Sequence, residues 1–474
     1  MTGQTYHFNG NEDQKTRLRL FKIAIFNIVG YSLINLCLSM AHNCKGAAMN
    51  FRTRKNLDIA IIGSGISGIC SAFLLQKRHN ITLFEKNSYF GGHTHTVLIP
   101  RGPDENTPVD TGFIVLNERT YPNFIKLLSQ LGVEKCRTDM SFSYYCERTR
   151  LCYASKNLNS IFAQRSNMVK PKFLRFVYEM VRFLQVLRKE YLLSRLMDIT
   201  LSEYADQKGL HREVIDQFII PMAAAIWSGS DFQISRFPIR TFAQFYENHG
   251  LLGVTGHPPW YFVKGGSHSY VNAFLKTFKG RAVKNAAVTR ISRKTDGVTL
   301  YFKNDEPQKF DAVVIAAHAD QALKLLRTPT VKEKDLLGVW SYSQNKTFLH
   351  TDTSVMPPSR RAWASWNYTR HGKSHSDSPV TVSYDMTHLQ KLKTRQRYFV
   401  TLNPQKPIPR NHVIKEIHYT HPQYSFKAFQ SQKELPALNG EQNTFFCGAY
   451  FGFGFHEDGV NSGLGVGKKF GVSL

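Results

Sequence analysis

The clearest pattern in the chain is a short run of apolar, β-branched residues at 57–62. A run of this kind, with no turn residue inside it, is typical of a buried strand in a parallel sheet. It ends in a glycine-rich segment, and residues 68–78 are predicted to form a helix after it. Residues 80–85 form a second apolar run that ends in Glu85. The pattern therefore predicts a strand–turn–helix–strand unit.

Runs of the same buried type return much later in the chain. Residues 310–317 precede a predicted helix at 319–326, and residues 444–447 precede a predicted helix at 461–470. Because parallel strands are joined by long crossover connections, runs that are distant in the sequence can lie side by side in one sheet. We predict an α/β fold with a Rossmann-like parallel sheet.

Two further segments predict a second, α+β part. Residues 170–198 carry apolar side chains at steps of three and four, which predicts an amphipathic helix. These apolar positions are Phe173, Val177, Met180, Leu184, Leu187 and Tyr191. Arginines and lysines fall between them, as in a cap helix with a solvated face or in a helix that lies on an acidic membrane. Residues 335–430 are strand-rich and aromatic, which indicates a sheet with one face against a pocket.

The glycines after the first strand have the spacing G-x-G-x-x-G, formed by Gly63, Gly65 and Gly68. In a dinucleotide-binding turn the first glycine allows the tight turn, the second lets a pyrophosphate approach the backbone, and the third lets the helix pack close to the strand. The helix N-terminus then faces the phosphates. Glu85 lies 22 residues after Gly63, where the motif places the carboxylate that binds the ribose. These features predict a dinucleotide site.

A second pair of glycines, Gly91 and Gly92, follows Glu85 after a short loop and precedes His93 and Thr94. An additional glycine turn at this place suits a long ligand that lies across the sheet, so it favours FAD over NAD. A simple β-turn without a ligand is the alternative interpretation.

The charge of the chain is unusual, whereas its composition is that of a globular protein. Its 474 residues are 42% hydrophobic and 20% charged, which is enough for two or three domains. The 61 Lys and Arg exceed the 35 Asp and Glu, for a net charge of +26. Such a charge favours an anionic partner, and we expect peripheral contact with an acidic membrane. Nucleic acid is not expected, because no zinc-finger spacing or RNA-binding aromatic motif is present. A generally basic proteome is the alternative.

The seven cysteines form no C-x-x-C pair. An odd number of cysteines without such pairs indicates a reducing compartment, and hence a cytoplasmic protein. The pattern gives no reason to expect a metal site.

Residues 1–48 precede the first predicted strand, and we interpret them as an extension outside the fold. Residues 21–41 are largely apolar and follow basic residues, as in a leader or a membrane segment. Asn, Ser, Tyr and Gly interrupt this stretch, which argues against a membrane anchor. Met49 lies just before the first strand, so both Met1 and Met49 fit as the start.

With these elements in order, the chain resembles the superfamily of FAD-dependent amine oxidases and phytoene desaturases from about residue 57 to its end. It is most similar to a subgroup of NAD/FAD-binding oxidoreductases that is associated with cyclopropane fatty-acyl-phospholipid synthases. The resemblance is carried by seven motifs in the same order, at residues 91–96, 109–117, 139–143, 260–267, 363–368, 399–404 and 448–459.

The resemblance implies a flavoprotein with two interleaved domains. The discontinuous FAD-binding domain would comprise residues 57–118, 258–330 and 440–474. The substrate domain, or cap, would comprise residues 119–257 and 331–439.

The resemblance also implies which residues hold FAD. The two glycine turns and Glu85 would bind the ADP half, and the amides at the start of the last helix would lie by the flavin ring. Many relatives carry an acid after the glycine of the last strand, where this chain has Ala449, so contact there would be made by the backbone or by another residue. The implied residues are Gly63, Ser64, Gly65, Ile66, Ser67, Gly68, Glu85, Lys86, Gly91, Gly92, His93, Thr94, Val288, Gly448, Ala449, Gly459 and Val460.

A flavin supplies the hydride chemistry itself, so the protein needs to bind, orient and exclude water. No Ser-His-Asp or Cys-His arrangement stands out, and we assign no general base. The candidate pocket residues, which lie in aromatic motif-bearing stretches, are Trp366, Tyr384, His456 and Lys264.

The leading hypothesis is oxidation or desaturation of an apolar substrate, a fatty acyl group of a lipid, by hydride transfer to FAD. A second hypothesis is oxidation of a small amine. A third is a flavin-binding partner without turnover that assists a lipid-modifying methyltransferase of the cyclopropane-synthase type.

Overall fold

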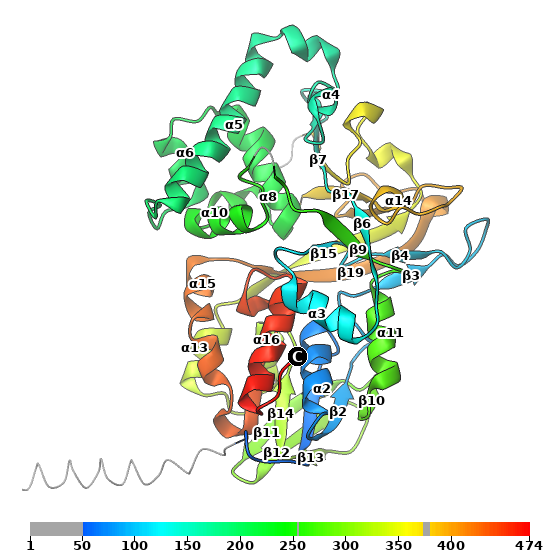
Figure 1. Cartoon of the computed structure of the whole chain (residues 1–474), viewed down its shortest axis with the longest axis vertical. Helices are drawn as coiled ribbons and strands as arrows, with labels where there is room; N and C mark the ends of the chain where they lie inside the picture. Colours follow the sequence, from blue (N-terminus) through cyan, green and yellow to red (C-terminus); the bar gives the residue numbers. More distant parts are fainter. Residues whose placement is uncertain (1–50, 254–255, 373–379) are drawn as a thin grey trace, which may run out of the picture. The chain divides into compact units, whose positions relative to one another are not determined.

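The computed structural model describes residues 51–253, 256–372 and 380–474. The expectations for residues 1–48, including the apolar segment 21–41, lie outside these residues. In the described part of the chain, no helix combines the length and the hydropathy that crossing a bilayer requires. The described residues form one compact unit of mixed α/β structure (Figure 1).

A five-stranded parallel sheet organises the first part of the fold. Its strand order is β10-β2-β1-β14-β20, and every neighbouring pair is parallel. The strands are β1 (Asp58–Ile62), β2 (Asn80–Phe84), β10 (Arg281–Val283), β14 (Ala312–Ile315) and β20 (Thr444–Phe446). Strands β1, β14 and β20 are the apolar runs that were predicted to lie in one sheet, and β2 is the apolar run that follows the first helix. The predicted Rossmann-like α/β fold is confirmed.

Each face of this sheet is covered by a different kind of structure. Helix α2 (Ile66–Leu75) packs on one face together with α16 (His456–Lys469) (Figure 1). The other face packs against a small antiparallel sheet of order β11-β12-β13, made of β11 (Val288–Lys294), β12 (Gly297–Phe302) and β13 (Gln308–Phe310). The remaining helices of this part are α11 (His268–Thr277), α12 (Ala319–Leu325), α13 (Val331–Leu337) and α15 (Phe426–Gln432).

Helices α2 and α16 approach closely because α16 presents glycines to its neighbour. A Cβ atom at Gly459 would lie 2.6 Å from Cγ2 of Ile66, and one at Gly467 would lie 2.8 Å from Cδ1 of Leu74. Between them, a Cβ at Gly463 would lie 3.0 Å from Cβ of Cys70. Gly459, Gly463 and Gly467, which are spaced four residues apart, therefore allow α16 to pack closely on α2.

We expect Gly463→Val to lower the free energy of unfolding by about 1–3 kcal/mol, since the added atoms have no space against α2. Gly465 is the matched control, because it lies in the same helix and has no atom within 4 Å of its Cβ direction. Gly465→Ala should raise stability by roughly 0.5–1 kcal/mol, as alanine does in a helix. Urea unfolding measures both, and equal effects of the two substitutions would contradict the packing argument.

The second part of the fold is built on a seven-stranded sheet of order β19-β15-β18-β17-β16-β7-β8. Its strands are β7 (Phe142–Cys146), β8 (Cys152–Ala154), β15 (Ser341–His350), β16 (Trp366–Arg370), β17 (Thr381–Asp385), β18 (Phe399–Leu402) and β19 (Val413–Gln423). One face of this sheet shares a large hydrophobic core with a group of helices. These include α5 (Pro171–Leu192), α6 (Leu201–Gln207), α8 (Ile220–Trp227), α9 (Asp231–Ser235) and α10 (Ile239–Asn248).

Short elements connect the two parts. Strands β5 (Leu116–Asn117), β9 (Trp260–Val263) and β6 (Lys135–Thr138) form one small sheet, and β3 (Thr96–Leu98) pairs with β4 (Pro108–Asp110). Helix α3 (Pro122–Gln130) packs on α16. Because α3 lies after residue 118 and still contacts α16, the two parts are linked more closely here than the expected boundary suggests. The boundaries themselves stay predictions.

Two helices differ from the expected bounds for local reasons. Helix α5 ends at Leu192 rather than near residue 198, because Ser194 takes a left-handed conformation with φ of +54°. Helix α16 begins at His456 rather than at residue 461. Its first turn is stabilised by Asp458, whose carboxylate accepts the backbone N–H of Phe455 at 2.9 Å.

Candidate functional site

The turn between β1 and α2 needs two of its glycines for the packing of the protein itself. Gly63 has φ of +99°, and a Cβ there would lie 2.4 Å from the carbonyl oxygen of Ala316, which directly follows the neighbouring strand β14. A Cβ at Gly68 would lie 2.0 Å from the carbonyl oxygen of Gly63. These two glycines shape the turn, as the sequence pattern predicts.

Gly65 is different, because a Cβ there would enter open space. No atom lies within 4 Å of that position, and the backbone, with φ of −64° and ψ of 174°, is one that any residue adopts. Gly65 is the N-cap of α2, which has no side-chain cap and no acid in its first turn. The helix N-terminus is therefore exposed to a space that a Cβ would fill, which fits the pyrophosphate of a dinucleotide.

Glu85 lies at the carboxyl end of β2, beside this turn. Its Oε2 accepts hydrogen bonds from the backbone N–H of Ser64 at 3.0 Å and from the Ser64 hydroxyl at 2.6 Å. Its carbonyl oxygen accepts the N–H of Ala286 at 2.9 Å, which holds the chain just before Val288 beside it. The structure thus brings the expected ribose and adenine contacts together, while Lys86 is exposed.

The second glycine pair folds back onto the first turn. The Gly91 N–H donates to the carbonyl oxygen of Ser64 at 3.1 Å. A Cβ at Gly92 would lie 3.2 Å from Cα of Gly65. Both glycines have positive φ, of +119° and +59°. Gly91 and Gly92 therefore form a wall of the space in front of Gly65.

The C-terminal residues of the predicted site reach the same place from the other end of the chain. Gly459 packs against Ile66, the first residue of α2, and Val460 is buried beside it. The N–H of Gly448 donates to the hydroxyl of Ser462 at 2.9 Å, and Ala449 begins a 3-10 turn (Ala449–Phe451). The structure thus gathers the glycine segments from three distant regions at one edge of the parallel sheet.

Asp458 is a half-buried acid next to Gly459 in the first turn of α16. Burial raises the pKa of Asp458 to about 7. A Cβ at Gly452 would lie 2.1 Å from its carboxylate, so Asp458 fixes the turn that precedes α16. Because this carboxylate also accepts the backbone N–H of Phe455, its hydrogen bonding stays within the turn.

The raised pKa of Asp458 predicts a pH dependence of stability. Between about pH 4 and pH 7 the folded state keeps the proton and the unfolded state, with a pKa of 3.8, does not. The contribution of Asp458 therefore favours unfolding as the pH rises, by about 1.4 kcal/mol per pH unit, and it is opposite in sign to the contribution of the histidines with lowered pKa values. Asp458→Asn should remove that slope between about pH 5 and pH 6 in urea titrations, while the exposed control Asp296→Asn should keep it. An unchanged slope in Asp458→Asn would contradict this assignment.

His456 is buried at the start of α16 and has partners for its ring. Its Nε2 lies 2.9 Å from the Thr94 hydroxyl and 3.2 Å from the Tyr270 hydroxyl. The ring stacks on Phe113 with centroids 3.6 Å apart. Burial lowers the pKa of His456 well below its usual value. The neutral imidazole therefore joins the second glycine turn, through Thr94, to α11 and α16.

The other pocket candidates lie elsewhere. Trp366 and Tyr384 are paired on adjacent strands of the seven-stranded sheet, edge to face with centroids 5.2 Å apart. The indole N–H of Trp366 is buried and has no hydrogen-bond partner. Lys264 is exposed and forms an ion pair of 2.6 Å with Glu134. The structure brings Trp366 and Tyr384 together and leaves Lys264 on the surface.

A half-buried histidine cluster beside the glycine turns was not anticipated. The ring of His93 lies 5.5 Å from that of His421 and 6.1 Å from that of His318, and it stacks on Tyr419 at 5.0 Å. Burial lowers the pKa of His318 and of His421 to about 3. The Nε2 atom of His93 is buried and has no hydrogen-bond partner among the described residues, so a free polar atom lies next to Gly92. The position of His318 directly after a parallel strand was a usable signal, whereas His421 gave none.

An aromatic wall faces the turn that precedes α16. We define it as Phe245, Phe429, Phe453 and Phe455. Phe245 of α10 stacks on Phe455 at 5.0 Å and meets Phe453 at 5.7 Å. Phe453 lies 6.5 Å from Phe429 of α15. The second part of the fold therefore meets the start of α16 through phenylalanine side chains.

Comparison with known proteins identifies relatives for this arrangement. The sequence profile of the flavin-containing amine oxidoreductase family matches residues 66–466. An L-amino-acid oxidase of Siganus canaliculatus is 22% identical over 364 residues, which cover 70% of this chain and 62% of that protein. The chain thus spans less than two thirds of the length of this curated relative.

Solved structures share the fold at low sequence identity. A CLA-producing fatty acid isomerase from P. acnes has a TM-score of 0.60 and 15% identity, with 86% of this chain and 97% of that chain covered. Cyclohexylamine oxidase from Brevibacterium oxydans also has a TM-score of 0.60, with 14% identity over 88% of this chain and 99% of that chain. Both likenesses concern the fold.

Proposed function

The chain belongs to the flavin-containing amine oxidoreductase family, and from this premise we propose that it oxidises or desaturates an apolar, fatty acyl-type substrate by hydride transfer to FAD. FAD is the cofactor of this family, and the open space before Gly65 fits its pyrophosphate. The association with cyclopropane fatty-acyl-phospholipid synthases stays a prediction.

When bound, the flavin supplies the hydride acceptor, and the residues of the chain bind, orient and exclude water. The N-terminus of α2 would hold the pyrophosphate together with the turn at Gly91 and Gly92. Glu85 would hold the ribose, and the amides of Gly459 and Val460 would lie by the ring.

The aromatic wall is the observation that carries the choice of an apolar substrate. Phe453 and Phe455 lie just before the helix where the flavin ring is expected, and Phe245 and Phe429 pack against them. The two acids nearest to it are occupied. Glu457 accepts the N–H groups of Asn123 and Phe124 at 3.0 and 2.8 Å, and Asp458 accepts that of Phe455. Neither carboxylate is available to bind an ammonium group, whereas phenylalanines suit an acyl chain.

Oxidation of a small amine is the second candidate, because an L-amino-acid oxidase and cyclohexylamine oxidase are among the relatives. Anaerobic titration of the yellow protein separates the candidates. Loss of flavin absorbance on addition of unsaturated or cyclopropanated phospholipid supports the proposal, and loss only with cyclohexylamine or L-amino acids overturns it. Flavin that no compound reduces, with a stable complex with a cyclopropane-synthase-type methyltransferase, would indicate a partner without turnover.

Substitution in the aromatic wall sharpens this experiment. Phe455→Ser should weaken reduction by lipid without removing bound flavin, because the side chain is expected to contact substrate. The matched control is Phe232→Ser, since Phe232 of α9 is 47% exposed and its ring is covered by Arg236. Equal effects of the two substitutions on reduction by lipid would count against a substrate site at the wall.

A further inference from the structure

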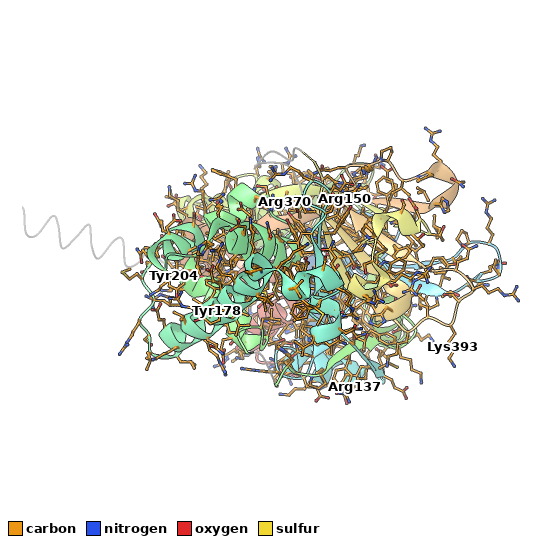
Figure 2. All side chains as sticks on the ribbon, turned by 90° about the horizontal axis from the view of Figure 1, so that it is seen from above. Arg137, Arg150, Tyr178, Tyr204, Arg370 and Lys393 are labelled. Carbon is orange, nitrogen blue, oxygen red and sulfur yellow. The ribbon has the colours of Figure 1, made fainter. Side chains whose placement is uncertain are left out.

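The outer face of α5 carries a continuous exposed stripe. Six exposed residues follow one another along this face at steps of three and four, and we call them the outer stripe. They are Leu174, Tyr178, Arg182, Gln185, Lys189 and Leu192. Tyr178 is 66% exposed and Leu192 is 61% exposed. Figure 2 shows Tyr178 on this helix, seen from above. The opposite face of α5 is buried in the core, so the helix is anchored and its outer stripe is free.

The exposed apolar side chains continue beyond both ends of the outer stripe. Met168 and Val169, 53% and 82% exposed, come directly before α5. Leu193 and Met197, 49% and 54% exposed, come directly after it. Apolar side chains exposed along one connected surface indicate an interaction site rather than scattered surface residues.

Positive charge surrounds these apolar residues and is only partly neutralised, because Lys172 pairs with Glu213 and Arg188 pairs with Glu247. Residues 165–195 contain eight Lys and Arg and two Glu. Both glutamates are occupied, Glu179 by His211 and Glu190 by Lys208. Within the described residues, Arg182 and Lys189 form no ion pair. The stripe itself contains no acid.

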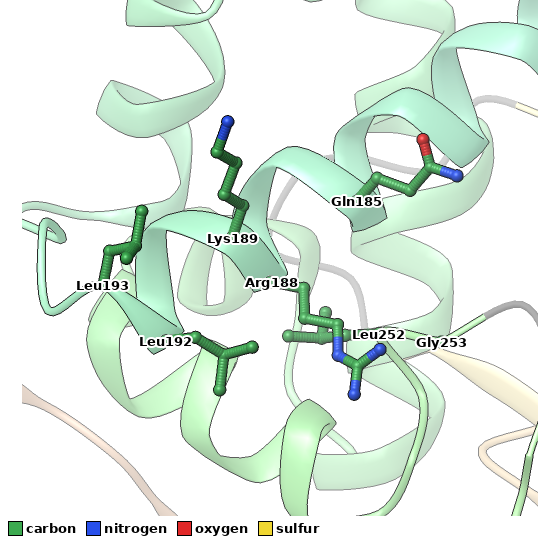
Figure 3. A pocket seen from close by; sticks show the side chains of 7 residues that line it. All are labelled: Gln185, Arg188, Lys189, Leu192, Leu193, Leu252 and Gly253. Carbon is green, nitrogen blue, oxygen red and sulfur yellow. The ribbon is translucent and has the colours of Figure 1, made fainter.

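A hollow of about 610 Å³ adjoins the C-terminal end of the stripe (Figure 3). Its lining is Gln185, Arg188, Lys189, Leu192, Leu193, Leu252 and Gly253. Arg188 is held by Glu247 at 2.9 and 3.0 Å, which leaves Lys189 as the unpaired cation beside three leucines. A phospholipid has a binding partner for each of these side chains, because its phosphate can bind the lysine and its acyl chain can contact the leucines.

We propose that the outer stripe and the adjoining hollow dock this protein on the surface of an anionic phospholipid bilayer. Leucine, methionine and tyrosine side chains enter the interface, while Arg182 and Lys189 extend their stems along it and reach the phosphates. As a source of substrate this docking rests on the proposed function. As a binding event it is independent of turnover.

Sedimentation of the full chain with vesicles tests the docking. We expect the protein to bind vesicles of phosphatidylcholine mixed with phosphatidylglycerol and to bind poorly to phosphatidylcholine alone. The double substitution Arg182→Glu and Lys189→Glu should lower the partition coefficient by about tenfold or more, since each basic residue near an anionic surface strengthens binding several-fold. Tyr178→Ser with Leu192→Ser should also weaken binding, and this loss should persist in high salt.

The matched control places the same charge change on other elements. Lys303→Glu with Lys427→Glu alters exposed lysines of the β-sheet region and of α15 and should leave binding within about twofold, as expected for charges away from the membrane. Equal losses in the two double variants, no vesicle binding by the unaltered chain, or binding insensitive to the charge of the lipid would each overturn the proposal. Saturable binding to an acidic protein in place of vesicles would overturn it as well.

The readout separates this proposal from the catalytic one. Vesicle binding without reduction of the flavin by lipid would leave the docking in place and reject the substrate assignment. If lipid in detergent reduces the flavin but the two double variants bind vesicles equally, the substrate assignment stays in place and the docking is rejected. Thermal unfolding and flavin content, measured on every variant, exclude loss of fold as the cause.

Discussion

Gly65→Asp is expected to abolish stable flavin binding while the protein stays folded. The substitution meets open space and an ordinary backbone conformation, so it costs the fold little. It places a carboxylate at the uncapped N-terminus of α2, where it competes for the helix dipole and repels a phosphate. Two like charges at about 4 Å near a protein surface cost about 4 kcal/mol, or several hundredfold in affinity.

Flavin absorbance after gel filtration and titration of the apoprotein with FAD measure this effect. Gly465→Asp is the control, because Gly465 also faces open space but lies on α16 away from the turn. It should retain flavin at the level of the unaltered protein. Retention of flavin by Gly65→Asp would show that the pyrophosphate does not lie at this turn.

Arg293→Met should lower the free energy of unfolding by about 3–5 kcal/mol, because it leaves a buried carboxylate unpaired. The side chains of Arg293 and Glu333 are 1% and 2% exposed and meet in two hydrogen bonds of 2.5 and 2.9 Å. Arg293 also donates to the carbonyl oxygen of Thr328 at 2.7 Å. The pair ties β11 to α13.

Chemical denaturation with two further variants isolates this pair. Arg290→Met changes an exposed arginine of the same strand, which only covers the Tyr301 ring, and should cost less than about 1 kcal/mol. The double substitution Arg293→Met with Glu333→Leu should recover much of the loss, since no charge then stays buried. If the double variant is less stable than Arg293→Met alone, the loss comes from the changed shape of the side chains and not from an unpaired charge.

The parallel sheet could be predicted because its signals are local. Strands β1, β14 and β20 are short and mostly apolar, as burial on both faces requires, and a helix follows each of them in the sequence. The 109–117 motif contains Gly112, and a glycine inside a strand-like run often marks close approach of a backbone or a ligand. A Cβ at Gly112 would lie 2.1 Å from the carbonyl oxygen of His93, so in the structure the approaching group is a backbone.

The candidate site was predictable only where backbone geometry dictates the residue. Gly63 and Gly68 have no alternative at their positions, and spacing alone finds them. His318 follows β14 of the parallel sheet and His421 lies in β19 of the seven-stranded sheet, so only the tertiary structure brings their rings to His93. No local pattern requires histidine at either position. The contrast between Lys264 and His456 has the same cause. Both lie in motifs, and only the tertiary structure shows that one is on the surface and the other is buried.

The glycine contacts between α2 and α16 have a consequence for the synthesis of the protein. The two helices meet across about 390 residues of chain, as in the contact between Cys70 and Val460. A nascent chain that has emerged only as far as β19 has the first glycine turn but lacks the helix that completes the space around it. We therefore expect stable flavin binding only once α16 has packed on α2, and a chain truncated before α16 should purify without flavin absorbance.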